Sequence, residues 1–444
     1  MKLSAGSSIR ELQVPTEVKI PVSQHIGAPA QPVVAVGDVV KVGQLIAQAT
    51  GFVSANIHSS VSGKVKKIED FVDANGYKKL GIVISVEGDE WVETIDRTSA
   101  VRREVTMSPA DIVKRVQEMG IVGMGGATFP AHVKLSVPAG KKCEALIING
   151  VECEPYLTSD HRLMLEHGEE VLIGVKILMR ALGVDQAYIG IENNKKDAID
   201  NLTRLASSFE GITVQPLKLR YPQGGEKQLI DACIGRQVPS GKLPIDVGAV
   251  VQNVGTVYAI YEAVQKNKPL VERIVCVTGK PLREPSNFLV RIGTPVSDLI
   301  EAAGGMPEDC GKVIGGGPMM GRAFTRLDVP VVKGTSGITL MSVEDSKRKE
   351  VRNCIRCAKC VSVCPMGLQP FLMSTLAKLG RYDDLRANHV MDCIECGCCI
   401  FTCPSNRPIL DYVRMGKARV GAQLRAEAAA RKAAAEAAKA SEAK

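Results

Sequence analysis

The run CIRCAKCVSVCP, residues 354–365, is followed by a near-copy, CIECGCCIFTCP, at residues 393–404. Both runs have the spacing C-x2-C-x2-C-x3-C-P, which is that of bacterial ferredoxins. Thiolates with two residues between them let one tight loop surround three irons of a cubane, while the last cysteine points toward the other cluster. The spacing therefore predicts two [4Fe–4S] clusters.

Each cluster is expected to take three cysteines from one run and the last cysteine of the other. The first set is Cys354, Cys357, Cys360 and Cys403, and the second is Cys393, Cys396, Cys399 and Cys364. Two zinc sites are the alternative, but four-thiolate zinc sites typically use two separated pairs of cysteines. Cys398 breaks the spacing and is expected to pack beside a cluster.

The linker between the runs has a helical pattern. Its apolar residues Leu368, Leu372, Leu376 and Leu379 recur at helical spacing, and Gly380 follows as a stop signal. A second short helix is expected over 382–390. The module is therefore predicted to be an α-helical ferredoxin, which needs a source of electrons elsewhere in the chain.

Composition limits the class of protein. A chain of 444 residues with 45% hydrophobic residues indicates several globular domains. An aromatic content of 4% and a net charge of +8 without a basic block argue against a nucleic-acid binder. We find no apolar run long enough to span a membrane and no signal peptide, so the 14 cysteines are expected to be in a reducing compartment.

Residues 31–68 read as short strands separated by glycine turns, with GDVVKVGQLIA at 37–47 and VSGKV at 61–65. This pattern resembles a lipoyl-type barrel-sandwich domain. The hairpin that carries the modified lysine in such domains is ANIHSSVSG here, at 55–63, and it has no lysine. We therefore expect the fold without a swinging arm, and His58 is expected to be solvated.

Glycines crowd the stretch GIVGMGGATFPAHVKL, residues 120–135. Gly123, Gly125 and Gly126 let backbone N–H groups approach a phosphate, and Lys134 follows within the next helix. The spacing alone matches neither a dinucleotide fingerprint nor a P-loop, so a structural role is equally compatible with it.

An alternation of strands and helices follows from residue 144 and indicates an α/β sheet. The apolar strand that ends at Asn149 is followed directly by Glu152, Glu154, Asp160 and Arg162. Polar groups beyond the carboxyl end of a strand are typical of ligand sites in open α/β sheets. For the two glutamates, a solvated loop is the alternative.

Four motifs, which occur in the same order as in a known family, indicate a family resemblance. GMGGATFP at 123–130, NGVECEP at 149–155, YPQGGEKQLI at 221–230 and VVQNVGTVYAI at 250–260 resemble the FMN-bearing, NADH-oxidising subunit of respiratory complex I. With QHIGAPAQPVV at 24–34 and the paired cysteine runs, residues 10–410 are more similar still to the C subunits of Rnf (Rsx) electron-transport complexes. The resemblance implies two [4Fe–4S] clusters, FMN and NAD(H) as cofactors.

The resemblance also implies roles for single residues. Gly123, Gly125, Gly126 and Lys134 would hold the FMN phosphate, Asn149 would line the flavin, and Glu152 and Glu154 would be the catalytic acids beside the flavin and nicotinamide. The remaining cofactor contacts would come from Gly225, Glu226, Lys242, Asn253 and Thr256. Four positions depart from the family pattern, namely Met124, Val151, Lys227 and Gln252.

The expected fold class is multidomain α/β plus β. Its parts are a barrel-sandwich hybrid over 1–105, an α/β FMN domain over 106–268, a soluble-ligand-binding β-grasp (SLBB) module over 269–345 and a dicluster ferredoxin over 346–412. Residues 413–444 are rich in Ala, Lys and Glu and predict a solvated, partly helical tail with little to pack. The glycine-rich GGGPMMG at 315–321 lacks the P-loop lysine and is expected to be a tight turn.

These parts predict a subunit that passes electrons between NAD(H) and a membrane-bound chain, through flavin and iron–sulfur clusters. Its expected partners are NADH and other Rnf subunits, both integral membrane and ferredoxin-like, with H+ or Na+ moved by those subunits. It is expected on the cytoplasmic face of a bacterial inner membrane. Two alternatives remain open, a soluble flavin dehydrogenase and a ferredoxin relay with a decayed flavin site.

Overall fold

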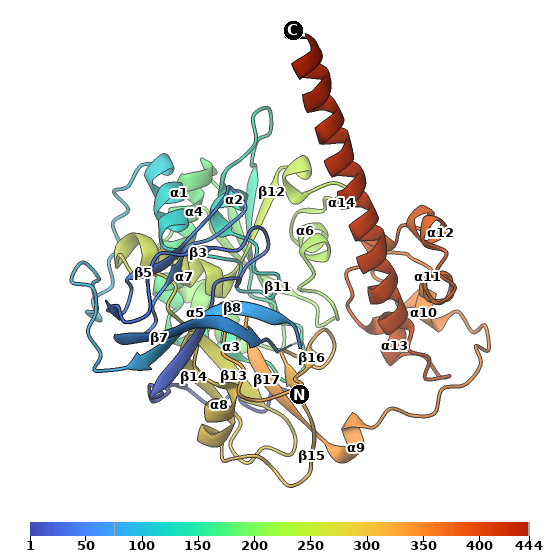
Figure 1. Cartoon of the computed structure of the whole chain (residues 1–444), viewed down its shortest axis with the longest axis horizontal. Helices are drawn as coiled ribbons and strands as arrows, with labels where there is room; N and C mark the ends of the chain where they lie inside the picture. The colour runs from blue at the N-terminus through green and yellow to red at the C-terminus, as the bar shows by residue number, and fades with distance from the viewer. Residues whose placement is uncertain (75, 443–444) are drawn as a thin grey trace. The chain divides into compact units, whose positions relative to one another are not determined.

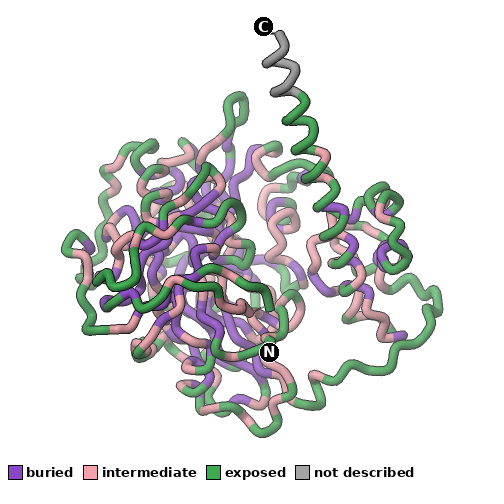
Figure 2. The backbone as a smooth tube through the Cα atoms, in the orientation of Figure 1, coloured by how far each residue is buried: buried purple, intermediate pink, exposed green. Residues whose placement is uncertain are grey.

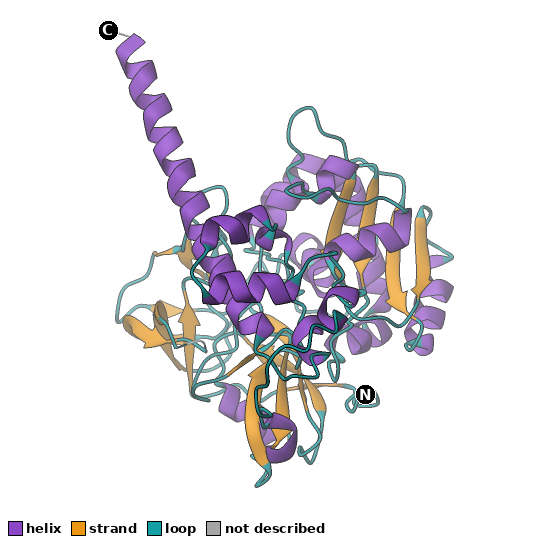
Figure 3. Cartoon of the chain, turned by 90° about the vertical axis from the view of Figure 1, so that its right-hand side faces the viewer, coloured by secondary structure: helices purple, strands orange, loops and turns teal. Residues whose placement is uncertain are grey.

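The computed structural model describes residues 1–74 and 76–442, and these group into two compact units. The first unit comprises Met1–Val238 and Leu243–Ser346, and the second comprises Pro239–Lys242 and Lys347–Lys444. Figure 1 shows the chain coloured from the N-terminus to the C-terminus, and Figure 3 shows it by secondary structure.

Two small sheets form the barrel-sandwich part of the first unit. One has the order β2-β8-β7-β4 and the other β3-β5-β6. Their strands are β2 Glu17–Pro21, β3 Gln31–Pro32, β4 Val39–Val40, β5 Leu45–Gln48, β6 Ile57–His58, β7 Gly63–Val72 and β8 Lys78–Val86. The alternating Val18, Ile20, Ile82 and Ile84 fill the core between them. His58 also lies inside, so the expectation that it is solvated is wrong, and its burial lowers its pKa to about 3.

A parallel sheet of order β11-β10-β9-β12 lies at the centre of the first unit. Its strands are β9 Ala145–Asn149, β10 Ala187–Glu192, β11 Ile212–Leu217 and β12 Ala249–Asn253. Both faces are covered: Leu146 and Ile148 pack in the core shared with α4 and α7, whereas Ile147 packs with Leu229 and Ile230 of α6. Near-continuous burial of β9 follows from this double cover.

Helices precede these strands and lie between them. Ser108 caps α1 (Pro109–Glu118) by accepting a bond from the backbone N–H of Asp111. The other helices are α2 Ala131–Leu135, α3 Ser159–Glu166, α4 Gly168–Leu182, α5 Lys196–Ala206, α6 Glu226–Ile234, the 3-10 helix η1 Pro244–Val247, and α7 Val254–Gln265.

The β-grasp part is a mixed sheet of order β1-β14-β13-β17-β15-β16. Its elements are β1 Ile9–Glu11, β13 Glu272–Thr278, β14 Ser286–Arg291, α8 Val296–Ala302, β15 Cys310–Gly315, β16 Arg322–Ala323, β17 Gly337–Ser342 and α9 Val343–Ser346. Strand β1 pairs with β14 in parallel, so residues 9–11 extend this sheet. Figure 2 shows the buried backbone of this unit in purple.

Among its described residues, the second unit has helices as its only regular elements. They are α10 Lys359–Ser362, α11 Pro370–Lys378, α12 Tyr382–Ala387, the 3-10 helix η2 Val390–Asp392, α13 Cys398–Phe401 and α14 Ile409–Glu442. The start of α14 packs on α11 and α12 through Val413 and Val420, which are both buried. The prediction that residues 413–444 have little to pack is therefore wrong for the first turns of this helix.

Candidate flavin and iron–sulfur sites

The central sheet has a topological switch point between β9 and β12. The chain runs from β9 outward to β10 and β11, then returns to place β12 on the other side of β9. Asn149 and Asn253 end these two neighbouring strands and are direct partners in the register. Ligands of open α/β sheets bind in the crevice outside the strands at such a point.

The glycine-rich loop presents free backbone N–H groups. The loop is closed by two bonds, from Gly123 N to Phe129 O at 2.8 Å and from Thr128 N to Gly123 O at 3.1 Å. Between them, Gly125, Gly126 and Ala127 are exposed, and within the described chain their N–H groups have no recorded partner. Gly126 has φ +114°, which disfavours any side chain. Consecutive free N–H groups in such a turn form an anion-binding cradle.

The amino end of α7 lies against this loop. Asn253 caps α7 by accepting from the N–H groups of Gly255 and Thr256, and a Cβ on Gly125 would lie 3.3 Å from the Cβ of Asn253. The Thr256 hydroxyl accepts a bond from Met124 N at 2.8 Å. Asn253 and Thr256 therefore shape the cradle, and the positive end of α7 adds to its attraction for an anion.

A second group of predicted residues meets across β12. The Lys134 ammonium lies 2.6 Å from a carboxylate oxygen of Glu226 and donates to Val251 O at 3.1 Å. Gly225 caps α6 directly before Glu226, and Asn149 donates to the neighbouring Gly224 O at 2.8 Å. The structure thus joins Lys134, Asn149 and the Gly–Glu pair around the carboxyl ends of β9 and β12.

The two predicted catalytic glutamates have distinct surroundings. Glu152 has φ +46°, and its carboxylate accepts from the N–H groups of Asp160 (2.9 Å) and His161 (3.3 Å) at the start of α3. Glu154 accepts from Met319 N at 3.1 Å and Met320 N at 2.7 Å, in the glycine-rich turn of the β-grasp part. Burial raises the pKa of Glu154, and these two N–H bonds oppose the rise.

Three other charged groups lie around the loop that carries Glu152 and Glu154. Two of them, Lys195 and Lys2, belong to no motif that the sequence pattern identified. Asp160 accepts from the amide of Asn253 at 2.7 Å, and burial together with the nearby Glu152 raises its pKa to about 7. The buried Lys195 donates to Val151 O at 2.6 Å, and burial lowers its pKa. Lys2 donates to Glu152 O at 2.8 Å. Both lysines come from segments far from the loop in sequence.

Lys242 is the exception among the predicted cofactor contacts. It is exposed, and its segment, Pro239–Lys242, groups with the second unit. Its role as a cofactor contact stays a prediction.

The two cysteine runs share a backbone pattern. Arg356 and Ala358 have φ of +56° and +57°, and Glu395 and Gly397, at the equivalent positions of the second run, have +58° and +84°. In each run the two left-handed residues flank the second cysteine, which bends the chain into a loop. This repeated curvature suits a loop that surrounds one cluster.

Cysteines of the two runs lie close together, and the assignment of each one to a cluster stays a prediction. One apolar cavity is lined by Cys364 of the first run together with Cys393, Cys396, Cys398 and Cys399 of the second. In the other set, the pKa of Cys360 is raised by burial and further by the nearby thiols of Cys403 and Cys354. Among the described residues, no three potential ligands converge on one point as a single metal ion requires.

Basic residues of α14 lie beside the second set. Lys417 donates to Cys393 O at 2.7 Å, and Arg414 pairs with Glu395 at 3.1 Å. The first turns of this helix thus fix the loop that carries three cysteines of the second set.

Comparison with protein families assigns each part. The chain matches the RnfC barrel sandwich hybrid domain at 1–89, the Nuo51 FMN-binding domain at 116–262, the SLBB domain at 274–323 and the 4Fe-4S dicluster domain at 346–404. An FMN-binding domain and a dicluster ferredoxin domain in one chain define an electron-transfer protein that joins flavin to iron–sulfur clusters.

Full-length relatives narrow this class. The chain is 48% identical over 87% of its length to the RnfC-type component of the proton-translocating ferredoxin:NAD(+) oxidoreductase complex of Clostridium ljungdahlii, covering 84% of that protein. It is 44% identical over 93% of its length to the corresponding component of the Na(+)-translocating ferredoxin:NAD(+) oxidoreductase complex of Acetobacterium woodii, covering 92%. The chain belongs to the RnfC family, the C subunits of ion-translocating ferredoxin:NAD+ oxidoreductase complexes.

Solved structures agree on the fold. A chain of an NAD+-reducing [NiFe]-hydrogenase, in the H2-reduced state, superposes with a TM-score of 0.50 at 19% identity. The match covers 69% of this chain and 61% of the hydrogenase chain. In the described part of the present chain, no helix is both long and apolar enough to cross a bilayer.

Proposed function

We propose that this chain exchanges electrons between NAD(H) and partner subunits through FMN and two [4Fe–4S] clusters. The observation that carries the proposal is the cradle of free N–H groups at Gly125, Gly126 and Ala127, beside the switch point of the sheet. Its chemistry fits a phosphate group, because N–H donors and a helix amino end favour an anion. Bound FMN would supply the conversion between two-electron hydride transfer and one-electron transfer.

The residues around the cradle would bind and orient this cofactor. The N–H groups of Gly125, Gly126 and Ala127 would contact the phosphate, and Gly123 closes the loop through its bonds with Phe129 and Thr128. Asn253 and Thr256 would hold the shape of the cradle. Lys134 and Glu226 would border the flavin on the side of β12, and Asn149 on the side of β9. Glu152 and Glu154 lie in the loop that would face the nicotinamide, where the turn at 316–321 holds the carboxylate of Glu154.

Two departures from the complex I pattern leave the cradle undisturbed, which favours a working flavin site over a decayed one. The side chain of Met124 is buried, and only its N–H takes part in the loop, by bonding Thr256. Val151 lies in the loop after β9, where its side chain is fully buried, and its carbonyl accepts a hydrogen bond from Lys195. Neither side chain occupies the exposed surface where the N–H groups gather.

The eight run cysteines would hold the two clusters in the crossed sets given above. Partner subunits, integral membrane and ferredoxin-like ones among them, would take the electrons onward and couple them to H+ or Na+ movement. The relative from Clostridium ljungdahlii is named as part of a proton-translocating complex, and the relative from Acetobacterium woodii as part of a Na(+)-translocating complex. We place the subunit at the cytoplasmic face of a bacterial inner membrane, held there by those partners.

Anaerobic stopped-flow spectroscopy tests the proposal. The cluster-reconstituted chain with bound FMN is mixed with NADH while flavin and iron–sulfur absorbance are followed together. We expect the flavin to bleach first and the clusters to follow. If dithionite reduces the bound flavin but NADH does not, the chain is a relay that takes electrons from another protein.

A further inference from the structure

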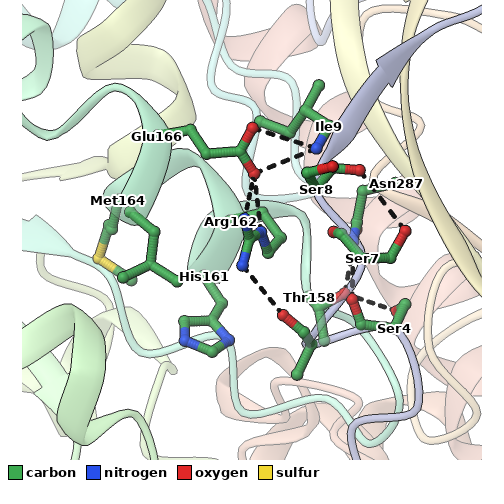
Figure 4. A network of polar contacts seen from close by, with 12 residues as sticks. Ser4, Ser7, Ser8, Ile9, Thr158, His161, Arg162, Met164, Glu166 and Asn287 are labelled. Carbon is green, nitrogen blue, oxygen red and sulfur yellow. Dashed lines mark hydrogen bonds and ion pairs between the residues drawn. The ribbon is translucent and has the colours of Figure 1, made fainter.

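The N-terminal strap, residues 1–12, runs between the central α/β part and the β-grasp part of the first unit. Figure 4 shows its contacts: the Ser4 hydroxyl lies 2.6 Å from that of Thr158, and Asn287 donates to the carbonyls of Ser4 and Ser7. Ile9 N donates to the carboxylate of Glu166 at 3.1 Å. The strap therefore contacts β14 on one side and α3, with the loop before it, on the other.

One side chain of the strap reaches into the loop that follows β9, residues 150–157, which we name the site loop. The Lys2 ammonium donates to three carbonyl oxygens of this loop, those of Glu152 at 2.8 Å, Glu154 at 3.0 Å and Leu157 at 2.6 Å. An ammonium has three donors, and all three are used here. With Val151 O bound to Lys195, four carbonyls of the site loop point at two lysines.

The conformation that these bonds hold is an unfavourable one. Glu152 and Tyr156 have φ of +46° and +72°, in a region that residues other than glycine rarely adopt. Such residues persist where their surroundings fix them, and they cluster at functional sites. Converging carbonyl dipoles also repel one another unless a cation lies between them. The three bonds from Lys2 therefore stabilise this conformation of the site loop.

The strap itself does not depend on Lys2. Strand β1 pairs with β14, and the bonds of Ser4, Ser7 and Ile9 fix the strap on both sides. Removal of the ammonium therefore takes three hydrogen-bond donors from the site loop and leaves the strap in place. This separates an effect on the loop from a loss of folding.

We propose that Lys2 is a positioning residue for the flavin and nicotinamide site, and this rests on the function proposed above. Because a trans peptide is planar, the bond from Lys2 to Glu152 O directs the N–H of Cys153 to the opposite side of the loop. Lys2 thereby fixes which backbone groups the loop turns away from the strap, and it holds Glu154 in reach of the β-grasp turn.

The test compares Lys2→Met, which keeps an apolar stem, with Lys2→Arg, which keeps the charge and the donors. Ser4→Ala is the control for strap docking, and Lys78→Met is the control for loss of an exposed lysine. In FMN-loaded, cluster-reconstituted protein, Lys2→Met is expected to reduce flavin with NADH at least tenfold more slowly than the parent, since small misplacement of reacting groups costs about 10²-fold. FMN affinity is expected to stay within about twofold because the cradle is untouched.

Lys2→Arg is expected to restore most of the rate, and Ser4→Ala to lower the thermal midpoint without slowing flavin reduction. An unchanged rate, flavin spectrum and midpoint potential in Lys2→Met would overturn the inference. So would an equal slowing by Ser4→Ala, because that would trace the effect to strap docking. If NADH fails to reduce even the parent flavin, the proposed function is wrong, and the flavin spectrum and midpoint potential of Lys2→Met still decide the role of Lys2.

Discussion

Lys333 offers a stability test that depends on a single buried amine. Its side chain is almost fully buried, at 1% exposure, and donates to Asn56 O and Gly120 O, each at 2.7 Å. Within the described chain, no carboxylate is among its recorded partners, and burial lowers its pKa from 10.5 to about 7. A neutral amine has two N–H donors, which match these two carbonyls.

The lowered pKa gives a slope of stability with pH. Above about pH 7 the folded chain holds Lys333 largely neutral, whereas the unfolded chain keeps it charged up to its ordinary pKa. Unfolding then takes up close to one proton, so this group makes the unfolding free energy rise with pH by about 1.36 kcal/mol per pH unit. From about pH 7 to about pH 9 the gain is about 2 to 3 kcal/mol.

Urea unfolding followed by fluorescence measures this gain, because Trp91 is the sole tryptophan and lies in the same unit as Lys333. We compare the parent with Lys333→Met, which has no titrating group at this position, and with Lys78→Met, which should keep the parent slope. The difference between parent and Lys333→Met cancels other groups, such as the buried cysteines. Parallel pH profiles for these two proteins would refute the reasoning that Lys333 is neutral in the folded state.

Three further predictions follow from backbone and ligand geometry. Gly126→Ala, at φ +114° with open space around its Cβ, is expected to weaken FMN binding at least tenfold in flavin-fluorescence titrations. Gly140→Ala, also at positive φ, should leave FMN affinity unchanged, and equal affinities of the two variants would contradict the proposal that the cradle binds FMN. Cys403→Ser is expected to lose about half of the bound iron, whereas Cys398→Ser should keep all of it. Full iron content and an unchanged electron paramagnetic resonance spectrum in Cys403→Ser would contradict the crossed ligand sets. Gly317→Ala would place a Cβ against a carboxylate oxygen of Glu154, so we expect it to displace this carboxylate and raise the KM for NADH. An unchanged KM would show that the contact with the turn is dispensable.

The order and type of the elements could be predicted from local pattern. The cysteine spacing, the apolar strand before Asn149 and the capped start of α1 each depend on residues within a few positions of one another. Glycine at position 126 likewise follows from a local requirement, its left-handed backbone. Such features can be predicted without knowledge of the fold, because they depend only on the local geometry of the chain.

The sequence could not show which surfaces the folded chain covers. His58 and Val420 looked like solvated residues in their own segments, yet both are buried by elements brought in from elsewhere. The sequence predicts a tight turn at 315–321, but it could not show that N–H groups of this turn bind Glu154.

The sequence by itself predicted the two clusters and the α/β alternation, because spacing and periodicity encode short-range geometry. Only the tertiary structure decided how the site loop is held. The bonds from Lys2 to Glu152 and Leu157 join residues 150 and 155 positions apart. No periodicity can report such a pair, because a buried donor finds its acceptors only when distant segments pack together.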